Sequence, residues 1–116
     1  MYVVYLGLTE HGRSINLAEP PLLKTGDAFR LLPGAGITFG RSQLCEVTIA
    51  SEHISNAHAL IAFVPGGGSH MALFDLQSRS GTWVEGRNRP LHLIGSGSEF
   101  NLGKAFRFRC QPARVK

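Results

Sequence analysis

The stretch from Ala57 to Leu76, AHALIAFVPGGGSHMALFDL, decides the fold class. It contains two short apolar runs, Ala57–Val64 and Met71–Leu76, on either side of the turn sequence Pro65–Gly68. Apolar runs of this length that are separated by Pro and Gly are typical of a β-hairpin. The stretch therefore predicts two antiparallel strands joined by a glycine-rich tip.

The same pattern of short apolar runs continues on both sides of this hairpin. The expected strands cover Tyr2–Leu8, Ala28–Leu32, Ile37–Phe39 and Val47–Ile49 before it, and Thr82–Val84, Leu91–Ile94, Glu99–Leu102 and Ala105–Cys110 after it. With 14 Gly and 6 Pro in 116 residues, the composition favours many short elements joined by turns. Because no helical pattern of about 10 to 15 residues alternates with these strands, we predict an all-β sandwich or barrel.

One segment, Glu10–Gly26, departs from the strand pattern, because it contains Pro20-Pro21 and has no clear period. We expect a long loop here, with room for one short helical turn.

A length of 116 residues fits a single domain around one core. We therefore expect residues 1–116 to form one domain that ends in a basic tail at residues 111–116.

The net charge of +4 raises the question of nucleic-acid binding. Four basic residues, Arg107, Arg109, Arg114 and Lys116, fall in the last ten positions without any acidic residue, so the other 106 residues carry 8 basic and 8 acidic side chains. Arg107 and Arg109 also alternate with Phe106 and Phe108, as expected for one strand with a solvated face and a core face. Nucleic-acid binding through the basic end is therefore a minor alternative.

The length of the apolar runs and the spacing of the cysteines indicate the cellular compartment of the protein. No apolar run approaches the 18 or so residues that a membrane span needs, and Met1–Leu8 lacks the basic flank and cleavage site of a secretory signal. Cys45 and Cys110 stand 65 residues apart without a C-x-x-C spacing. We expect two buried, reduced thiols and a cytoplasmic protein, or a nuclear one if the source is eukaryotic.

Several segments resemble the signature motifs of enzymes but do not match them. Gly34–Gly40 has one residue too many for G-x-G-x-x-G, and Gly97–Lys104 has five residues between its glycines where a P-loop has four. Residue types alone give little support to a triad of Ser55, His58 and Asp75. The five histidines have no paired metal spacing, so we expect no metal, no cofactor and no catalytic activity.

Small polar residues and arginines gather instead at the ends of predicted strands. Gly40-Arg41 ends one strand, Ser55 and His58 open another, and Asp75–Thr82 spans the turn after the hairpin. With Gly97–Gly103, these four blocks occur in the order and spacing G-R, S-x-x-H, D-L-x-S-x-x-G-T and G-x-x-x-x-L-G. Over about residues 28–110 the chain thus resembles the forkhead-associated (FHA) domain, a phosphothreonine-binding β-sandwich.

The resemblance implies a sandwich of about eleven strands in two antiparallel or mixed sheets, whose ligand lies across loops at one end. It implies that Arg41, Ser55 and Asn56 contact a phosphate and that Arg79 and Ser80 face the peptide backbone. It gives structural roles to His58, Gly40, Gly81 and Thr82. The residue chemistry agrees, because a guanidinium presents a rigid, always charged fork for phosphate oxygens, and hydroxyl and amide groups add further donors.

The sequence departs from the family pattern at two places. Ser80 stands where the family has an asparagine that holds the peptide main chain, so we expect weaker or altered peptide binding. Residues 9–26 form an insertion in the usual first connection, and they are a second candidate contact surface. We predict an adaptor that binds phosphothreonine proteins after kinase action. The alternative is a degenerate FHA-like scaffold that binds partners independently of phosphate, through a sheet face or this insertion.

Overall fold

A computed structural model describes residues 1–112 of the chain, and these residues form eleven strands and one short helix. The elements, in chain order, are β1 (Tyr2–Leu8), α1 (Glu10–Ser14), β2 (Ala28–Arg30), β3 (Gly36–Gly40), β4 (Val47–Thr48), β5 (Ala59–Phe63), β6 (Met71–Asp75), β7 (Thr82–Val84), β8 (Arg87–Asn88), β9 (Leu91–Ile94), β10 (Glu99–Leu102) and β11 (Phe106–Gln111). The predicted hairpin corresponds to β5 and β6, which pair antiparallel from Ala59 opposite Asp75 to Phe63 opposite Met71.

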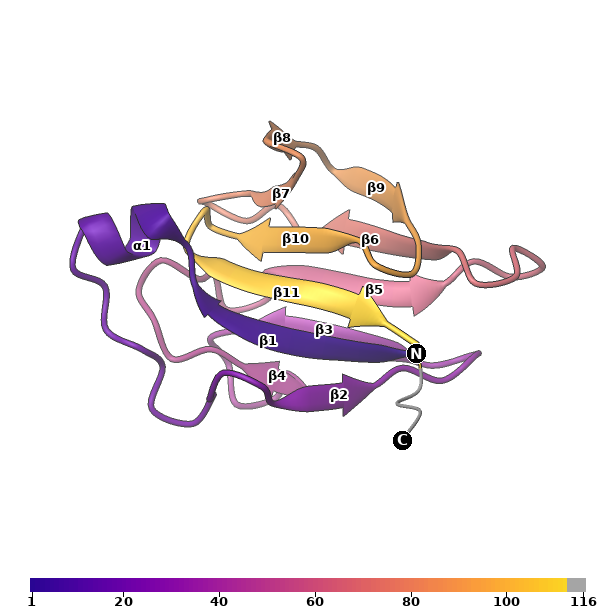
Figure 1. Cartoon of the computed structure of the whole chain (residues 1–116), viewed down its shortest axis with the longest axis horizontal. Helices are drawn as coiled ribbons and strands as arrows, with labels where there is room; N and C mark the ends of the chain where they lie inside the picture. Colours follow the sequence, from indigo (N-terminus) through magenta and orange to yellow (C-terminus); the bar gives the residue numbers. More distant parts are fainter. Residues whose placement is uncertain (113–116) are drawn as a thin grey trace.

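The strands form two sheets that face each other (Figure 1). The six-stranded sheet has the order β2-β1-β11-β10-β7-β8, and the five-stranded sheet has the order β4-β3-β5-β6-β9. All pairings are antiparallel except that of β3 with β4, which is parallel. The prediction of an all-β sandwich of about eleven strands in two mixed sheets is confirmed.

Aromatic side chains fill the space between the sheets. Phe108 of β11 lies 5.2 to 5.4 Å, between ring centroids, from Tyr5, Phe39 and Phe100, which come from both sheets. All four side chains are fully or almost fully buried. Each such ring removes a large apolar area from water, so this cluster helps to hold the two sheets together.

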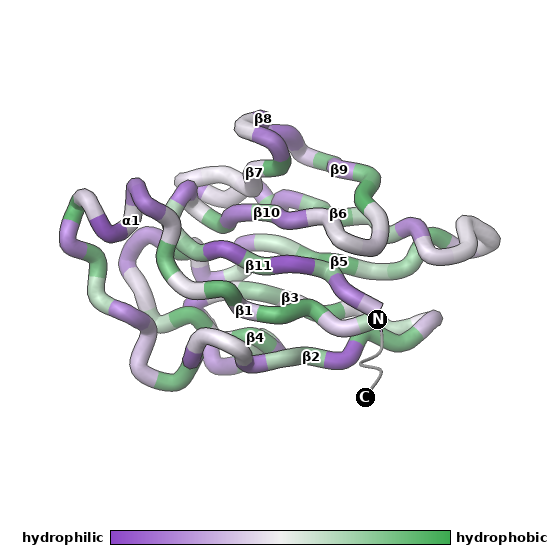
Figure 2. The backbone as a smooth tube through the Cα atoms, in the orientation of Figure 1, coloured by the Kyte–Doolittle hydropathy of each residue, from purple (hydrophilic) through white to green (hydrophobic). Residues whose placement is uncertain are grey.

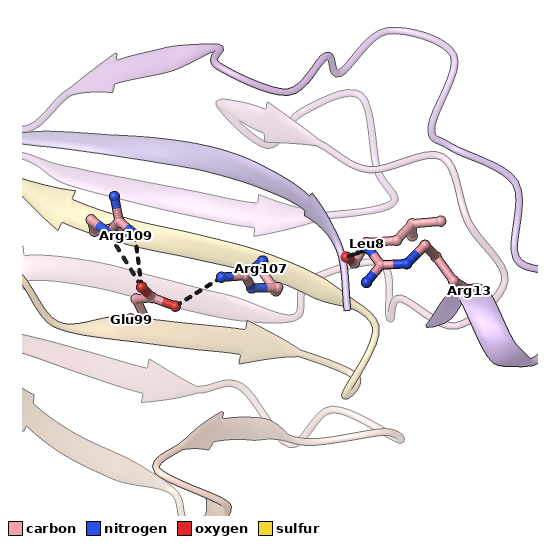
Figure 3. A network of polar contacts seen from close by, with 5 residues as sticks. All are labelled: Leu8, Arg13, Glu99, Arg107 and Arg109. Atoms are coloured by element: carbon pink, nitrogen blue, oxygen red, sulfur yellow. Dashed lines mark hydrogen bonds and ion pairs between the residues drawn. The ribbon is translucent and has the colours of Figure 1, made fainter. Parts of the chain in front are cut away.

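The alternation predicted for the last strand is confirmed. Phe106 and Phe108 are buried, whereas Arg107 and Arg109 lie on the outer face and both form ion pairs with Glu99 of β10, at 3.2 and 2.9 Å (Figure 3). Glu99 thus offsets part of the positive charge that these two arginines would offer to a nucleic-acid backbone. The two basic residues of the predicted tail, Arg114 and Lys116, lie outside the described residues.

Two expectations need correction. Cys110 is buried as expected, but Cys45 is only partly buried, because it lies in the surface loop between β3 and β4. Both cysteines are free thiols. The strand β8 was not predicted, since Arg87 and Asn88 are both exposed and polar and show no alternation with apolar residues.

The segment between β1 and β2 contains the short helix α1. Thr9 caps this helix by accepting a hydrogen bond from the backbone N–H of Gly12, at 2.9 Å. Farther along the segment, Glu19 accepts a hydrogen bond of 2.8 Å from the hydroxyl of Tyr5. These contacts hold the segment against the end of the sandwich where β1 finishes (Figure 1).

Within residues 1–112, no helix is long and apolar enough to cross a membrane.

Candidate functional site

Three loops meet at one end of the five-stranded sheet. The chain leaves β3 and β6 at this end and enters β5 there, because β5 is antiparallel to both of its neighbours (Figure 1). The loop after β3 contributes Arg41, the loop before β5 contributes Ser55 and Asn56, and the loop after β6 contributes Arg79 and Ser80. The predicted phosphate-contacting and peptide-contacting residues therefore come from three adjoining loops.

Arg41 is held by its backbone and by its side chain. Its backbone N–H donates to the carbonyl of Ser55 at 3.0 Å, and its Nε–H donates to Oδ1 of Asn56 at 3.3 Å. Within residues 1–112, the two terminal nitrogens of the guanidinium form no hydrogen bond or ion pair with protein groups. The exposed fork is therefore oriented by Asn56 while most of its donors remain available to an anion.

Ser55 and Asn56 are neighbours of this fork with donors of their own. Oγ of Ser55 accepts a hydrogen bond of 3.0 Å from the backbone N–H of Arg79. No residue among those described accepts the Ser55 hydroxyl proton, so that proton is available to a ligand. Since Oδ1 of Asn56 accepts from Arg41, the amide NH2 of Asn56 faces away from the guanidinium and remains a donor.

His58 is fully buried beneath these loops and connects two of them. Its Nδ1 accepts a hydrogen bond from the backbone N–H of Ser55 at 3.2 Å, and its Nε2 lies 2.7 Å from the carbonyl of Gly81. This pattern defines a neutral ring protonated on Nε2. Both ring nitrogens are engaged with backbone groups, so His58 is not available as a base for a triad of Ser55, His58 and Asp75.

Burial lowers the pKa of His58 below its ordinary value of 6.5, although the carbonyl of Gly81 and the charge of Asp75 act in the opposite direction. The unfolded chain therefore binds this proton more readily than the folded chain. We predict that stability is independent of this group above about pH 7 and falls as the pH drops through the unfolded pKa towards the folded one. Urea unfolding of the wild type and of His58→Gln between about pH 7.5 and pH 5.5 measures the effect. An equal pH slope for both proteins would contradict the prediction.

The turn between β6 and β7 is built around the carboxylate of Asp75. This carboxylate accepts hydrogen bonds from the backbone N–H of Ser78 at 3.1 Å, from the Ser78 hydroxyl, and from Oγ1 of the buried Thr82 at 2.7 Å. Oγ of Ser78 in turn accepts from the backbone N–H of Gly81, whose φ of 91° favours glycine. The roles expected for Gly81 and Thr82 thus correspond to a turn organised by Asp75 and Ser78.

Ser80 joins the loop after β6 to the loop before β5. Its hydroxyl donates to the carbonyl of His53 at 2.5 Å, and a Cβ on Gly103 would lie only 2.7 Å from its Oγ. Because the Ser80 proton is committed to His53, this side chain can accept a hydrogen bond from a ligand but has no donor left for one. The neighbouring Arg79 is exposed, and its side chain has no hydrogen-bond or ion-pair partner among residues 1–112.

Sequence reasoning did not give roles to three residues that support this end. Asn88 of β8 accepts a hydrogen bond from the backbone N–H of Thr82, Trp83 donates through Nε1 to the carbonyl of Ser80, and Lys104 lies 4.3 Å from the Trp83 ring centroid. Lys104 and Trp83 are far apart in the sequence, Asn88 lies on a polar strand without a pattern, and the bond from Trp83 to Ser80 depends on the conformation of the turn between them. Only the spacing of Asp75 and Ser78, which is typical of a local side-chain turn, carried a usable signal.

Together these features define a class of protein: a β-sandwich that presents an arginine fork, a hydroxyl donor and an amide donor on adjoining loops at one end. The family model described as "FHA domain" matches residues 37–103, which include all three loops. The chain belongs to the FHA domain family.

Solved structures agree with this assignment of fold. The FHA domain of a hypothetical protein from Arabidopsis thaliana has a TM-score of 0.72 and 22% identity, with 99% of this chain and 88% of that chain covered. The FHA domain of the CT664 protein from Chlamydia trachomatis has a TM-score of 0.71 and 21% identity, with 97% of both chains covered. Mycobacterium tuberculosis EmbR in complex with a low-affinity phosphopeptide has a TM-score of 0.65 and 20% identity, with 98% of this chain and 26% of that chain covered. No curated protein matches the chain.

Proposed function

We propose that this chain is a non-catalytic adaptor that binds phosphothreonine-containing segments of partner proteins. The observation that carries the proposal is the Arg41 fork, which Asn56 orients at 3.3 Å and whose two terminal nitrogens have no partner among residues 1–112. The backbone N–H of Arg41 also donates to the carbonyl of Ser55, whose hydroxyl proton has no acceptor among the described residues. A phosphothreonine carries about −1.5 to −2 charges and three acceptor oxygens at neutral pH. An oriented guanidinium with two neighbouring neutral donors is suited to such a group.

Family members support the proposal. One related structure, EmbR from Mycobacterium tuberculosis, is described in complex with a phosphopeptide, and another related structure is described in terms of phosphothreonine-dependent FHA domain interactions. By analogy, Arg41, Ser55 and Asn56 of this chain bind the phosphate, and Arg79 and Ser80 contact the peptide backbone. Phosphorylation by an upstream kinase then switches binding on, because the unphosphorylated residue offers no charge to Arg41.

Ser80 limits how the peptide main chain is held. Since its proton is donated to His53, it offers a peptide N–H one acceptor and offers a peptide carbonyl nothing. An asparagine at the same position would present both an acceptor and two donors. The exposed Arg79 supplies the donors that Ser80 lacks, so Arg79 is the residue on this loop that is free to bind a peptide carbonyl.

Three matched peptides, with phosphothreonine, phosphoserine and unmodified threonine in one sequence context, test the function by fluorescence polarisation. We expect saturable binding of both phosphopeptides and none of the unmodified one. Phosphothreonine is expected to bind about fourfold more tightly than phosphoserine, because burial of one methyl group contributes about 0.8 kcal/mol. Equal binding of all three peptides would instead support the alternative of a scaffold that binds independently of phosphate.

A further inference from the structure

The outer face of the five-stranded sheet is apolar over β5, β6 and β9, although the outer face of an antiparallel sheet is usually polar. Three cross-strand neighbours on β5, β6 and β9, Leu60, Phe74 and Leu91, share one row of this face. The next row contains Ala62, Ala72 and Leu93. None of these six side chains is charged, and Phe74, Leu91 and Leu93 are exposed large hydrophobic residues. Figure 2 gives the hydropathy along β5, β6 and β9.

The exposure of the leucines on β9 follows from the buried residues of the same strand, which fix its register. His92 and Ile94 face inwards and are buried, and Nε2 of His92 lies 2.9 Å from the carbonyl of Thr82. Leu91 and Leu93 therefore face outwards, and Leu93 is 70% exposed. Because a shift of one residue would remove His92 from its partner and expose Ile94, the two leucines cannot turn into the core.

A hollow of about 350 Å³ joins this face to the three loops. Leucines lie at two sides of it: Leu44 in the loop after β3, which is 92% exposed, and Leu76 directly after β6. The remaining lining residues are Thr38, Ser42, Cys45, Asn56 and Ala57. Asn56 therefore borders the hollow and also orients Arg41, so the hollow begins where the candidate phosphate site ends.

We infer that this hollow, bordered by Leu44 and Leu76, is a second subsite that binds an apolar side chain near the phosphothreonine of the same partner protein. The inference rests on the proposed function. A peptide whose phosphate is bound by Arg41 is held beside the hollow, so an apolar residue in it contacts Leu44 and Leu76 at a high effective concentration. Beyond the hollow, Phe74 and Leu91 continue the apolar surface for a longer partner segment.

Continuity with the phosphate site favours the partner over a second copy of this chain. Asn56 is a candidate phosphate contact and also lines the hollow, so one extended segment can occupy both. The residues that line the hollow are uncharged, although one of them, Thr38, donates a hydrogen bond of 2.9 Å to the carboxylate of Glu46. This lining suits leucine, isoleucine or phenylalanine better than a charged side chain. The partner is thus a phosphoprotein with an apolar residue close to its phosphothreonine.

A leucine scan of the peptide tests the inference. One leucine is moved through successive positions on both sides of phosphothreonine in an otherwise alanine-rich and serine-rich peptide, and each affinity is divided by that of the leucine-free peptide. We expect one position to tighten binding to the wild type about tenfold. The ratio is expected to fall to about one in the double variant Leu44→Ser, Leu76→Ser, which changes no charge near Arg41. Leu22→Ser, an exposed leucine that does not line the hollow, keeps the wild-type ratio.

The experiment distinguishes failure of the second subsite from failure of the proposed function. Binding that needs the phosphate and Arg41 but gains nothing from leucine at any position would overturn the subsite and leave the proposed function intact. Absence of phosphate-dependent binding would overturn both. Sedimentation of the phosphopeptide-free protein adds a further test. A concentration-dependent dimer that the double variant abolishes would show that a second copy covers the hollow, contrary to the inference.

Discussion

Replacement of Arg41 by alanine is expected to weaken phosphopeptide binding by about 100-fold, with almost no change in stability. Two charge-assisted hydrogen bonds from a guanidinium to a phosphate contribute about 3 kcal/mol together, which corresponds to a factor of about 100 in Kd. Arg41 is exposed, and among residues 1–112 its side chain forms one hydrogen bond, with Asn56. Its removal therefore changes the stability of the fold by only about 0.5 kcal/mol.

Two further variants make this prediction specific. Arg41→Lys keeps the charge but loses the fork, and the Nε–H bond to Asn56 cannot form, so we expect an intermediate loss of about tenfold. Arg30→Ala removes the same charge from β2, an edge strand of the other sheet, and binding should remain close to wild type. Fluorescence polarisation with one phosphothreonine peptide compares all four proteins. Equal losses for Arg30→Ala and Arg41→Ala would mean that net charge, and not the site, governs binding.

Replacement of Gly40 by alanine is expected to damage both the fold and the site. A Cβ at this position would lie 2.1 Å from the carbonyl oxygen of Asn56 and 2.8 Å from Sγ of Cys45. The carbonyl of Asn56 is backbone and accepts a hydrogen bond from the N–H of Ser42, so it cannot move without separating the two loops. Overpacking of this kind costs about 1 to 3 kcal/mol and should lower the Tm by about 10 °C.

Gly95→Ala is the matched control for this variant. A Cβ on Gly95 meets no atom within 4 Å, and Gly95 is not among the glycines with positive φ. We expect its Tm and its phosphopeptide affinity to equal those of the wild type. In Gly40→Ala the affinity should fall with the Tm, because the clash separates Arg41 from Asn56. A Gly40→Ala protein with wild-type Tm and affinity would show that the junction of the two loops is looser than the structure indicates.

Much of the fold could be predicted from the sequence because most strands carry a local signal. The alternation in β11 distinguishes Phe106 and Phe108 from Arg107 and Arg109, and the glycine-rich tip identifies the hairpin of β5 and β6. The strand β8 has no such signal, since its two residues are polar and exposed and become a strand only by pairing with β7. Thr9 was not predicted as a helix cap, because the helix it begins is a single short turn.

The residues of the candidate site could be predicted from the spacing of the sequence motifs. The hydrogen bonds between these residues could not be predicted in that way. That Ser80 donates to the carbonyl of His53, or that Ser55 accepts from the N–H of Arg79, depends on how three loops meet in space. The partial exposure of Cys45 also depends on how the loops meet in space. No sequence pattern indicates that a cysteine borders a surface hollow. The apolar outer face also escaped the sequence pattern, since the leucines of β9 lie outwards while His92 lies inwards.

The central claim is that Arg41, Ser55 and Asn56 together bind the phosphate of a phosphothreonine peptide. The most direct measurement is an NMR titration of the 15N-labelled chain with a degenerate phosphothreonine peptide pool and, separately, with its unphosphorylated twin. We expect the Arg41 Nε–H signal, the Asn56 amide signals and the backbone N–H signal of Ser55 to shift with the phosphorylated pool alone. Equal shifts with both pools, or shifts confined to residues outside the three loops, would contradict it.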